Sequence, residues 1–409
     1  MILKTKKRKN WAALVQKQGW PVVLLLTVQL LSGIVLTPQR SFFPIYLEEQ
    51  LGYAAVAVSA FVTMGQLLGM VASALGGTLC DVLGRKWTLV LGLTGFVFGS
   101  LMYLVRVPWL VASLWAVSCL GLGFHALGGQ SYMIDVAGPE HLGLISALFH
   151  WGYTIGGALS SPGAGFILDR QGFGPFGLAL LALSLATTVG TLAFLPRLRA
   201  RRGADTPAWS RSLFGYRDII RRPVMVILGL LRFLPTCYYG MATVLNPLLI
   251  NRMAGSKTAV SLYTTLSLIL ATLGQAVTGR AADRWGRRRP TLGAFGVLIV
   301  AIVGQACFAT HLWSFYVFGV LGICAAWSLA TLLPCLVSDA AVAEERGRVL
   351  GMLEVLWNVG MMVGALTGGT LVETALGLPF FLAAALNLGA IVLAVSFFRL
   401  VAPQENRIA

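Results

Sequence analysis

The chain has 409 residues, of which 57% are hydrophobic and 11% are charged, and its formal net charge is +16. About one quarter of the residues of a soluble domain are charged, so this composition excludes an ordinary soluble protein. The basic excess could indicate a nucleic-acid partner, but its distribution along the chain argues against one.

Long apolar stretches recur from one end of the chain to the other, with short polar connections between them. A helix needs about 20 apolar residues to cross a bilayer. Several stretches are longer than that, which indicates tilted helices. The predicted spans are 21–47, 54–75, 87–105, 109–134, 143–168, 174–195, 223–250, 258–278, 290–309, 312–338, 348–372 and 378–401. We therefore expect an all-α membrane protein with twelve transmembrane helices.

The basic residues gather on one side of the predicted membrane. Of 31 Lys and Arg residues, 25 lie in the termini or in the connections that follow even-numbered spans. This asymmetry predicts that both termini are cytoplasmic and that the basic residues contact anionic lipid headgroups rather than nucleic acid. The absence of an Asn-x-Ser/Thr glycosylation site favours a bacterial inner membrane.

One ten-residue motif occurs twice, as GTLCDVLGRK at 77–86 and as GRAADRWGRR at 279–288. Asp135 and Asp339 repeat at a similar spacing, and the polar segment 197–222 separates the two copies. Internal duplication of this kind is typical of membrane carriers. The predicted parts are a cytoplasmic tail at 1–20, a six-helix bundle at 21–196, a basic cytoplasmic linker at 197–222, a second six-helix bundle at 223–401 and a cytoplasmic tail at 402–409.

With these repeated motifs the chain resembles carriers of the Major Facilitator Superfamily over essentially its whole length. The resemblance implies two pseudo-symmetric six-helix bundles around a central cavity. It places spans 1, 4, 7 and 10 at the cavity, spans 2, 5, 8 and 11 beside it, and spans 3, 6, 9 and 12 against lipid. It also implies secondary active transport of a small molecule by alternating access.

The repeated motif places a carboxylate and a basic residue at the cytoplasmic ends of spans two and eight. Such a carboxylate can pair with an arginine or accept hydrogen bonds from helix N-terminal amides. The resemblance implies a latch that holds the cytoplasmic side closed in the outward-open state; a solvated turn that only fixes topology is the alternative. The predicted latch residues are Gly77, Asp81, Gly84, Arg85, Gly279, Asp283, Gly286 and Arg287, with Asp135 and Asp339 as further partners.

Span five contains GALSSPGAG at 157–165, which resembles the antiporter motif of the drug-exporting branches. The residues that carry the resemblance are Gly157, Ser161, Pro162 and Gly165. Small residues allow close helix packing and proline kinks a helix; ordinary small-residue packing is the alternative reading. Span four keeps two glycines of another exporter motif but has Val117 where exporters carry an arginine linked to proton coupling. Coupling must therefore use another group or be absent.

Ionisable side chains are costly inside a bilayer, so each one within a span is a candidate for function. Glu354 is the only carboxylate well inside a span, and we expect it to carry the coupled proton with His150 or Arg232 as its partner. A structural polar contact is the alternative. Span one carries Arg40 and no acid, which favours anionic, zwitterionic or neutral cargo. The candidate cavity residues are Gln29, Arg40, His125, Trp151, Arg232, Thr243, Trp327, Trp357 and Asn358.

The preferred function is proton-coupled antiport, with export of small amphipathic organic compounds. Alternatives with the same fold are a flippase for an anionic lipid, lysolipid or glycolipid, and an organic-anion exchanger; a transporter-like sensor without flux belongs to another class. The sequence has no phosphate-binding Gly-Lys-Ser/Thr loop and no cluster of metal ligands, so we expect no enzyme activity, cofactor or metal site. A monomer in the cell membrane is expected, with protons and a small molecule as partners.

Overall fold

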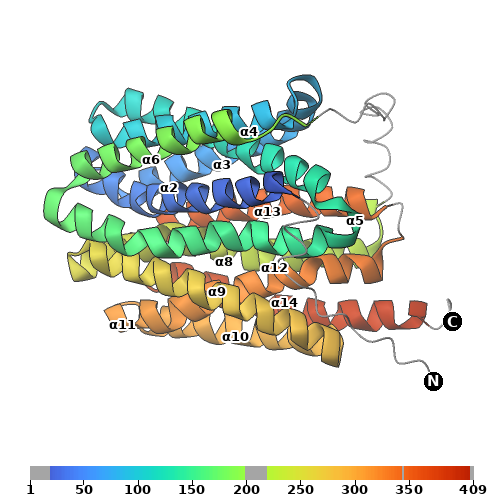
Figure 1. Cartoon of the computed structure of the whole chain (residues 1–409). Coiled ribbons are helices and arrows are strands. Elements are labelled where there is room, and N and C mark those ends of the chain that lie inside the picture. Colours follow the sequence, from blue (N-terminus) through green and yellow to red (C-terminus); the bar gives the residue numbers. More distant parts are fainter. Residues whose placement is uncertain (1–18, 199–218, 343–344, 406–409) are drawn as a thin grey trace.

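The computed structural model describes residues 19–198, 219–342 and 345–405, without the side chains of 77, 78, 81, 138–144, 347 and 402–405. In this part of the chain the regular structure is helical and contains no strand. Long helices run back and forth side by side through the molecule (Figure 1). The predicted fold class, an all-α membrane protein with two helical bundles, is confirmed.

The first bundle contains five long helices, and one of them supplies two crossings. They are α2 (Trp20–Leu51), α3 (Ala55–Val82), α4 (Arg85–Leu101), continued by η1 (Met102–Leu104), α5 (Pro108–Gln171) and α6 (Phe173–Phe194). The second bundle also has six crossings. They are α8 (Pro223–Ala254), α9 (Lys257–Trp285), α10 (Arg288–Cys307), the run α11 (Leu312–Ser314), η2 (Phe315–Gly319) and α12 (Val320–Ala340), α13 (Arg346–Leu371) and α14 (Leu378–Glu405). The connections between successive crossings in a bundle are short, so neighbours in the chain run antiparallel.

Helix α5 contains both of the predicted spans 109–134 and 143–168. It has 64 residues, and a straight helix of that length would extend about 96 Å, roughly three times the hydrocarbon thickness of a bilayer. The helix instead folds back on itself, so that a Cβ added to Gly129 would lie 3.0 Å from the ring of Phe149 (Figure 1). The two predicted spans are thus two limbs of one helix, since the backbone between them stays helical. We call 108–137 the first limb and 145–171 the second limb.

Eleven helices within the described residues are long and apolar enough to cross a membrane by length and composition. The first limb of α5 is one of them. The second limb is the twelfth crossing of the fold, and its sequence is richer in glycine, serine and other polar residues. It packs against helices of both bundles, with Gly156 on α2 and Gly165 on α9.

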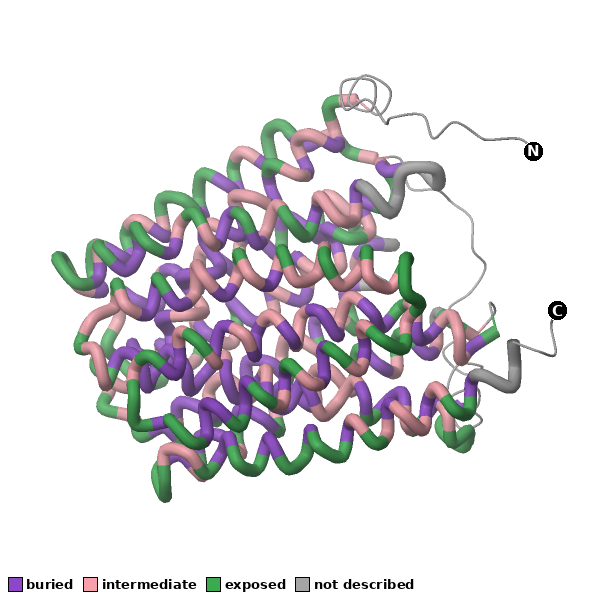
Figure 2. The backbone as a smooth tube through the Cα atoms, turned by 90° about the horizontal axis from the view of Figure 1, so that it is seen from below, coloured by how far each residue is buried: buried purple, intermediate pink, exposed green. Residues whose placement is uncertain are grey.

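The two bundles meet mainly where α3 packs against α13 and α5 packs against α9, and α2 makes smaller contacts with α8 and α9. Helices α4 and α6 lie at one edge of the molecule and α10 and α14 at the opposite edge (Figure 1). Buried and exposed positions alternate along the helices at the surface of the molecule (Figure 2). In α4, α6, α10 and α14 this pattern gives each helix one face on its bundle and one face outward. They carry predicted spans three, six, nine and twelve, the four that the resemblance places against lipid.

The two ends of the molecule are named by their charge. The basic end holds the starts of α2, α4, α8, α10 and α13, and the far end holds the starts of α3, α6, α9 and α14. At the basic end, Gly84 and Gly286 terminate α3 and α9 with φ values of 87° and 76°, which glycine adopts at little cost. Gly77 and Gly279 lie inside those helices, and a Cβ on Gly279 would meet nothing within 4 Å. The positive-φ residues of these two connections are therefore Gly84 and Gly286.

Candidate functional site

A cavity of about 320 Å³ lies between the two bundles, near the middle of the long helices. Its walls come from α2, α3 and both limbs of α5 on one side and from α8, α9, α12 and α13 on the other. Among the described residues that line it, Arg40 is the only charged one. We call this space the Arg40 cavity.

Arg40 is half-buried and its contacts are polar and aromatic rather than ionic. Its Nη2 donates to Oε1 of Gln66 at 3.4 Å, and its guanidinium lies 6.0 Å from the ring centroid of Trp115. Nε2 of Gln66 in turn donates to Oδ1 of Asn358 at 3.0 Å. Since Asn358 is on α13, this chain of contacts crosses from the first bundle to the second. Within the described residues, Arg40 has no carboxylate within ion-pair distance.

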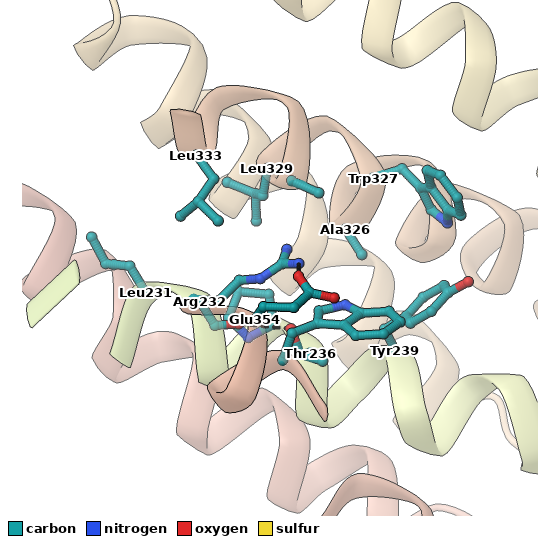
Figure 3. Close-up of a pocket in the computed structure, with 12 residues that line it drawn as sticks. Leu231, Arg232, Thr236, Tyr239, Ala326, Trp327, Leu329, Leu333 and Glu354 are labelled. Atoms are coloured by element: carbon teal, nitrogen blue, oxygen red, sulfur yellow. Dashed lines mark hydrogen bonds and ion pairs between the residues drawn. The ribbon is translucent and has the colours of Figure 1, made fainter. Parts of the chain in front are cut away.

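A second cavity, of about 180 Å³, lies inside the second bundle between α8, α12 and α13. Figure 3 shows that the Arg232 guanidinium and the Glu354 carboxylate point toward each other there. Nη2 of Arg232 is 3.9 Å from Oε2 of Glu354, and the guanidinium lies 5.6 Å from the ring centroid of Trp357. We call this space the Arg232 cavity.

Three aromatic residues, Tyr239, Trp327 and Trp357, line both cavities. The rings of Tyr239 and Trp327 meet edge to face, with 6.2 Å between their centroids. We call these three residues the aromatic wall. Because the wall belongs to both cavities, a movement of Trp357 changes the surroundings of Arg232 on one side and the space around Arg40 on the other.

Polar contacts join the two bundles at the far end. Nε of Arg252 donates to Glu48 at 2.6 Å, and Glu49 accepts from Asn251 and pairs with Lys257, each at 2.8 Å. These contacts tie the last turn of α2 to the end of α8 and the start of α9. They therefore hold the bundles together on this side of the Arg40 cavity.

Asp169, near the end of α5, caps the first turn of α9. It accepts hydrogen bonds from the backbone amides of Lys257 and Thr258 at 2.7 and 2.9 Å and from the hydroxyl of Ser256 at 2.7 Å. Partial burial raises the pKa of Asp169, but the bonds from Thr258, Ser256 and Lys257 outweigh it and leave the pKa below its ordinary value. An ionised Asp169 thus stabilises the contact between the bundles.

The antiporter-like motif lies in the second limb of α5, against the second bundle. Pro162 has no N–H, so the carbonyl of Ala158 lacks its helical partner. Thr265 of α9 donates to that carbonyl at 3.3 Å. Ser161 is buried and donates to the carbonyl of Gly157 at 2.7 Å. Pro162 therefore leaves the Ala158 carbonyl available to accept a hydrogen bond from the second bundle.

Two glycines of the same motif lie at close contacts. A Cβ on Gly165 would lie 2.8 Å from the backbone oxygen of Lys257, so α5 and α9 approach closely there. Gly157 packs against Thr37 of α2 within the first bundle. The small side chains of the motif thus serve packing both inside the first bundle and between the bundles.

At the basic end the two arginines of the repeated motif pair with acids of their own bundle. Arg85 pairs with Asp135, and Arg287 pairs with Asp339. Arg287 also donates to the carbonyl of Cys335 at 2.7 Å and to Ser338 Oγ at 3.0 Å. Both clusters therefore fasten neighbouring helices within one bundle.

The two motif carboxylates are placed differently from these arginines. The structure does not describe the side chain of Asp81 or the surroundings of Gly77. Asp283 is exposed on the last turn of α9 and has no ion-pair partner among the described residues. Arg287, four residues later, pairs with Asp339 instead of Asp283.

Several other predicted residues gather at the two cavities. Arg40 and Thr243 line one, Glu354 lines the other with Arg232, and Trp327 and Trp357 line both. Asn358 reaches the first through Gln66.

Four predicted residues lie elsewhere, outside the lining of either cavity: Gln29, His125, His150 and Trp151. His125 is buried inside the first bundle, where its Nε2 lies 3.0 Å from Ser32 Oγ. Gln29 is buried in the same bundle, and His150 and Trp151 are exposed on the second limb of α5. The expected pairing of His150 with Glu354 is absent among the described contacts; Arg232 is the partner that the structure shows.

The sequence interpretation missed the neutral residues around Arg40 and the charged cluster at the far end. Gln66, Trp115 and Tyr239 carry no motif and lie in apolar helices. The far-end cluster did have a signal: Arg252 and Lys257 are two of the few basic residues on that side of the membrane, and Glu48 and Glu49 occupy the matching end of the first span.

A duplicated set of antiparallel helices around a shared central cavity defines a membrane carrier. The sequence profile of the Major Facilitator Superfamily matches residues 25–256 and, in a second match, 233–409. The chain therefore belongs to the Major Facilitator Superfamily.

Named relatives include drug-resistance proteins of low identity. The tetracycline resistance protein of class H from Pasteurella multocida is 26% identical over 45% of the chain and 46% of its own length. The class C protein from Escherichia coli is 31% identical over 40% of the chain and 41% of its length. The chain thus spans less than half of the length of these two relatives in the matched segments.

Solved structures of the same fold belong to transporters that are named for different compounds. The nucleoside transporter NupG superposes with a TM-score of 0.72 at 16% identity, covering 93% of this chain and 98% of its own. A D-xylose–proton symporter superposes with a TM-score of 0.74 at 15% identity, covering 92% and 97%. At these identities the likeness establishes the fold.

Proposed function

We propose that the protein is a secondary active transporter that exports small amphipathic organic compounds in exchange for protons. The observation that supports this most is the arrangement of Arg232 and Glu354 in a cavity that shares its aromatic wall with a second, larger cavity. The names of the drug-resistance relatives support export as the direction.

The basic end is, in this proposal, the cytoplasmic end, because the positive-inside rule places basic connections there. The far-end contacts of Glu48, Glu49 and Asp169 then close the outer side. Glu354 lies closer to the basic end and is 66% exposed. In this proposal the protein is therefore in a state that is closed outside and open toward the cytoplasm.

Coupling in this proposal starts at Glu354. An ionised Glu354 attracts the Arg232 guanidinium, and protonation removes that attraction. Because Arg232 also lies over Trp357, a change in its position alters the aromatic wall and thereby the Arg40 cavity. Protonation of one carboxylate thus changes the space in which the cargo binds.

The latch role of the repeated motif belongs to the opposite state. In the present state Arg85 and Arg287 hold helices within their own bundles. When the cytoplasmic side closes, we expect the Asp81 and Asp283 carboxylates to meet helix N-termini of the other bundle, where a negative charge is favourable. Closure would then involve the motif carboxylates while the arginine clusters stay intact.

An organic-anion exchanger is the second candidate, because the cavity holds Arg40 and no acid. Transport into proteoliposomes with and without an imposed pH gradient tests the two candidates. Proton-coupled export predicts that a pH gradient drives cargo uphill and that a protonophore abolishes this; anion exchange predicts flux that needs a counter-anion and ignores the protonophore. Binding without any flux would instead support the sensor alternative.

A further inference from the structure

We propose that the Arg40 cavity takes a small aromatic monocarboxylate, whose carboxylate pairs with the Arg40 guanidinium and whose ring lies among the aromatic side chains. This inference rests on the proposed function, since it names the cargo class of the same transporter. It does not require proton coupling, because it concerns the contacts of the bound cargo alone.

The charge balance of the cavity sets the charge of the cargo. Arg40 is the one charged side chain among the described residues that line it, and no carboxylate lies within ion-pair distance of it in that part of the chain. A guanidinium that is partly removed from water without an ionic partner loses part of its solvation energy. A ligand with one negative charge offsets that cost, whereas a cation would add a second positive charge.

A carboxylate fits this cavity better than a phosphate monoester. A phosphate monoester carries close to two negative charges at neutral pH. The repeat equivalent of Arg40 is Thr243, whose hydroxyl donates to the carbonyl of Gly240 at 2.9 Å. Among the described residues that line the cavity, the second bundle supplies no second cation, so a dianion would keep one charge unpaired.

The Arg40 guanidinium has unused N–H donors and contacts the protein on two sides. An arginine has five N–H donors in a fixed fork that matches a carboxylate. The described structure uses one of them, in the 3.4 Å contact to Gln66. Gln66 is itself fixed by Asn358, and Trp115 is fixed by stacking on Phe43 with 3.8 Å between ring centroids. Arg40 is thus positioned, with most of its hydrogen-bonding capacity left for a ligand.

The walls and the volume indicate an aromatic body of one or two rings. Trp115 lies on the Arg40 side, and Tyr239, Trp327 and Trp357 form the opposite wall. Aromatic faces at such positions favour stacked or edge-to-face contacts with a ring. A volume of about 320 Å³ is at the small end of the range for ligand pockets, roughly 300–1,000 Å³.

The test measures binding to the full-length protein in nanodiscs by titration calorimetry, with thermal unfolding as a second readout. The probes are benzoate, 2-naphthoate and indole-3-acetate, the corresponding neutral amides, and phenyl phosphate. The variants are Arg40→Gln, which removes the charge, and Arg40→Lys, which keeps the charge but loses the fork. Arg106→Gln is the matched control, because Arg106 is an exposed arginine in the connection before α5.

The expected result is that at least one carboxylate binds tenfold or more tightly than its amide, and more tightly than phenyl phosphate. Arg40→Gln brings the carboxylate-to-amide ratio to about one, Arg40→Lys leaves an intermediate ratio, and Arg106→Gln keeps the wild-type ratio. A ratio near one in the wild type, no binding of any carboxylate, or an unchanged ratio in Arg40→Gln overturns the proposal. Arg40-dependent binding without flux would leave this inference standing and remove the proposed transport function.

Discussion

Glu354 and Arg232 face each other inside the second bundle, with 3.9 Å between Oε2 and Nη2. Their side chains differ in exposure: Glu354 is 66% exposed and Arg232 is 14% exposed. The arginine is therefore enclosed by protein, while most of the carboxylate side chain is exposed. Glu354 lies near the start of α13, which is at the basic end.

The capping role of Asp169 predicts an acid-sensitive contact at the far end. An intramolecular hydrogen bond contributes about 1 kcal/mol, so Asp169→Ala, which removes the acceptor of these bonds, should lower the free energy of unfolding by about that amount or more. The pKa of Asp169 is lowered in the folded protein, so its contribution is complete above the ordinary pKa of an aspartate, about 3.9. It is lost as pH falls through the lowered value.

Chemical unfolding of the wild type and Asp169→Ala at neutral pH and near pH 3 measures this contribution. The difference between the two proteins should shrink on acidification. Glu373→Ala is the matched control, because Glu373 is the repeat-equivalent acid beyond α13. A difference that stays constant over this pH range would show that ionised Asp169 does not hold the cap.

The close approach of α5 and α9 predicts opposite effects for two neighbouring glycines. Gly165→Ala places a Cβ 2.8 Å from the Lys257 carbonyl oxygen, so the helices must separate. Overpacking of this kind costs about 1–3 kcal/mol. Gly163→Ala meets nothing within 4 Å and should be neutral or slightly stabilising, since alanine favours a helix over glycine by about 1 kcal/mol.

Thermal unfolding of the two variants, made in parallel, tests this prediction. Equal melting temperatures for Gly165→Ala and Gly163→Ala would mean that the bundles are not in contact at this position. A lower melting temperature for Gly165→Ala alone would support the packed interface.

The bond from Thr265 to the Ala158 carbonyl should depend on the proline that frees that carbonyl. Thr265→Val removes the bond and should cost about 1 kcal/mol. Pro162→Ala restores an N–H to α5, which can then bond Ala158 within the helix. In that background Thr265→Val should cost almost nothing. A double-mutant cycle of unfolding free energies gives the coupling; additive effects would exclude the proposed link between the motif and α9.

The sequence predicted the fold well because span length and charge are read directly from composition. The basic connections and the repeated motif located the spans and the two bundles, and the prediction of two bundles is confirmed. Spans four and five are joined without a loop, since the backbone of α5 remains helical through the bend. The apolar pattern predicts which segments cross a membrane, but it does not predict how successive crossings are joined.

Prediction of the site from the sequence was limited because the sequence does not show how each helix is rotated about its axis or which helices pack against it. Gln29 and Arg40 lie on nominally the same face of α2, yet Gln29 is buried within its bundle and Arg40 lines the cavity. His125 contacts Ser32, and α4 packs closely, through Gly92, on the backbone of His125. Which polar side chain reaches the cavity thus depends on contacts between helices that are distant in sequence. Neutral residues such as Gln66 give no signal of their own.

The role of Glu354 is tested most directly with Glu354→Gln in proteoliposomes. The glutamine keeps the size of the side chain and cannot release a proton. We predict that counterflow down a cargo gradient stays close to the wild-type rate, whereas accumulation driven by a pH gradient falls to background. Uphill accumulation by Glu354→Gln at the wild-type level would contradict the account.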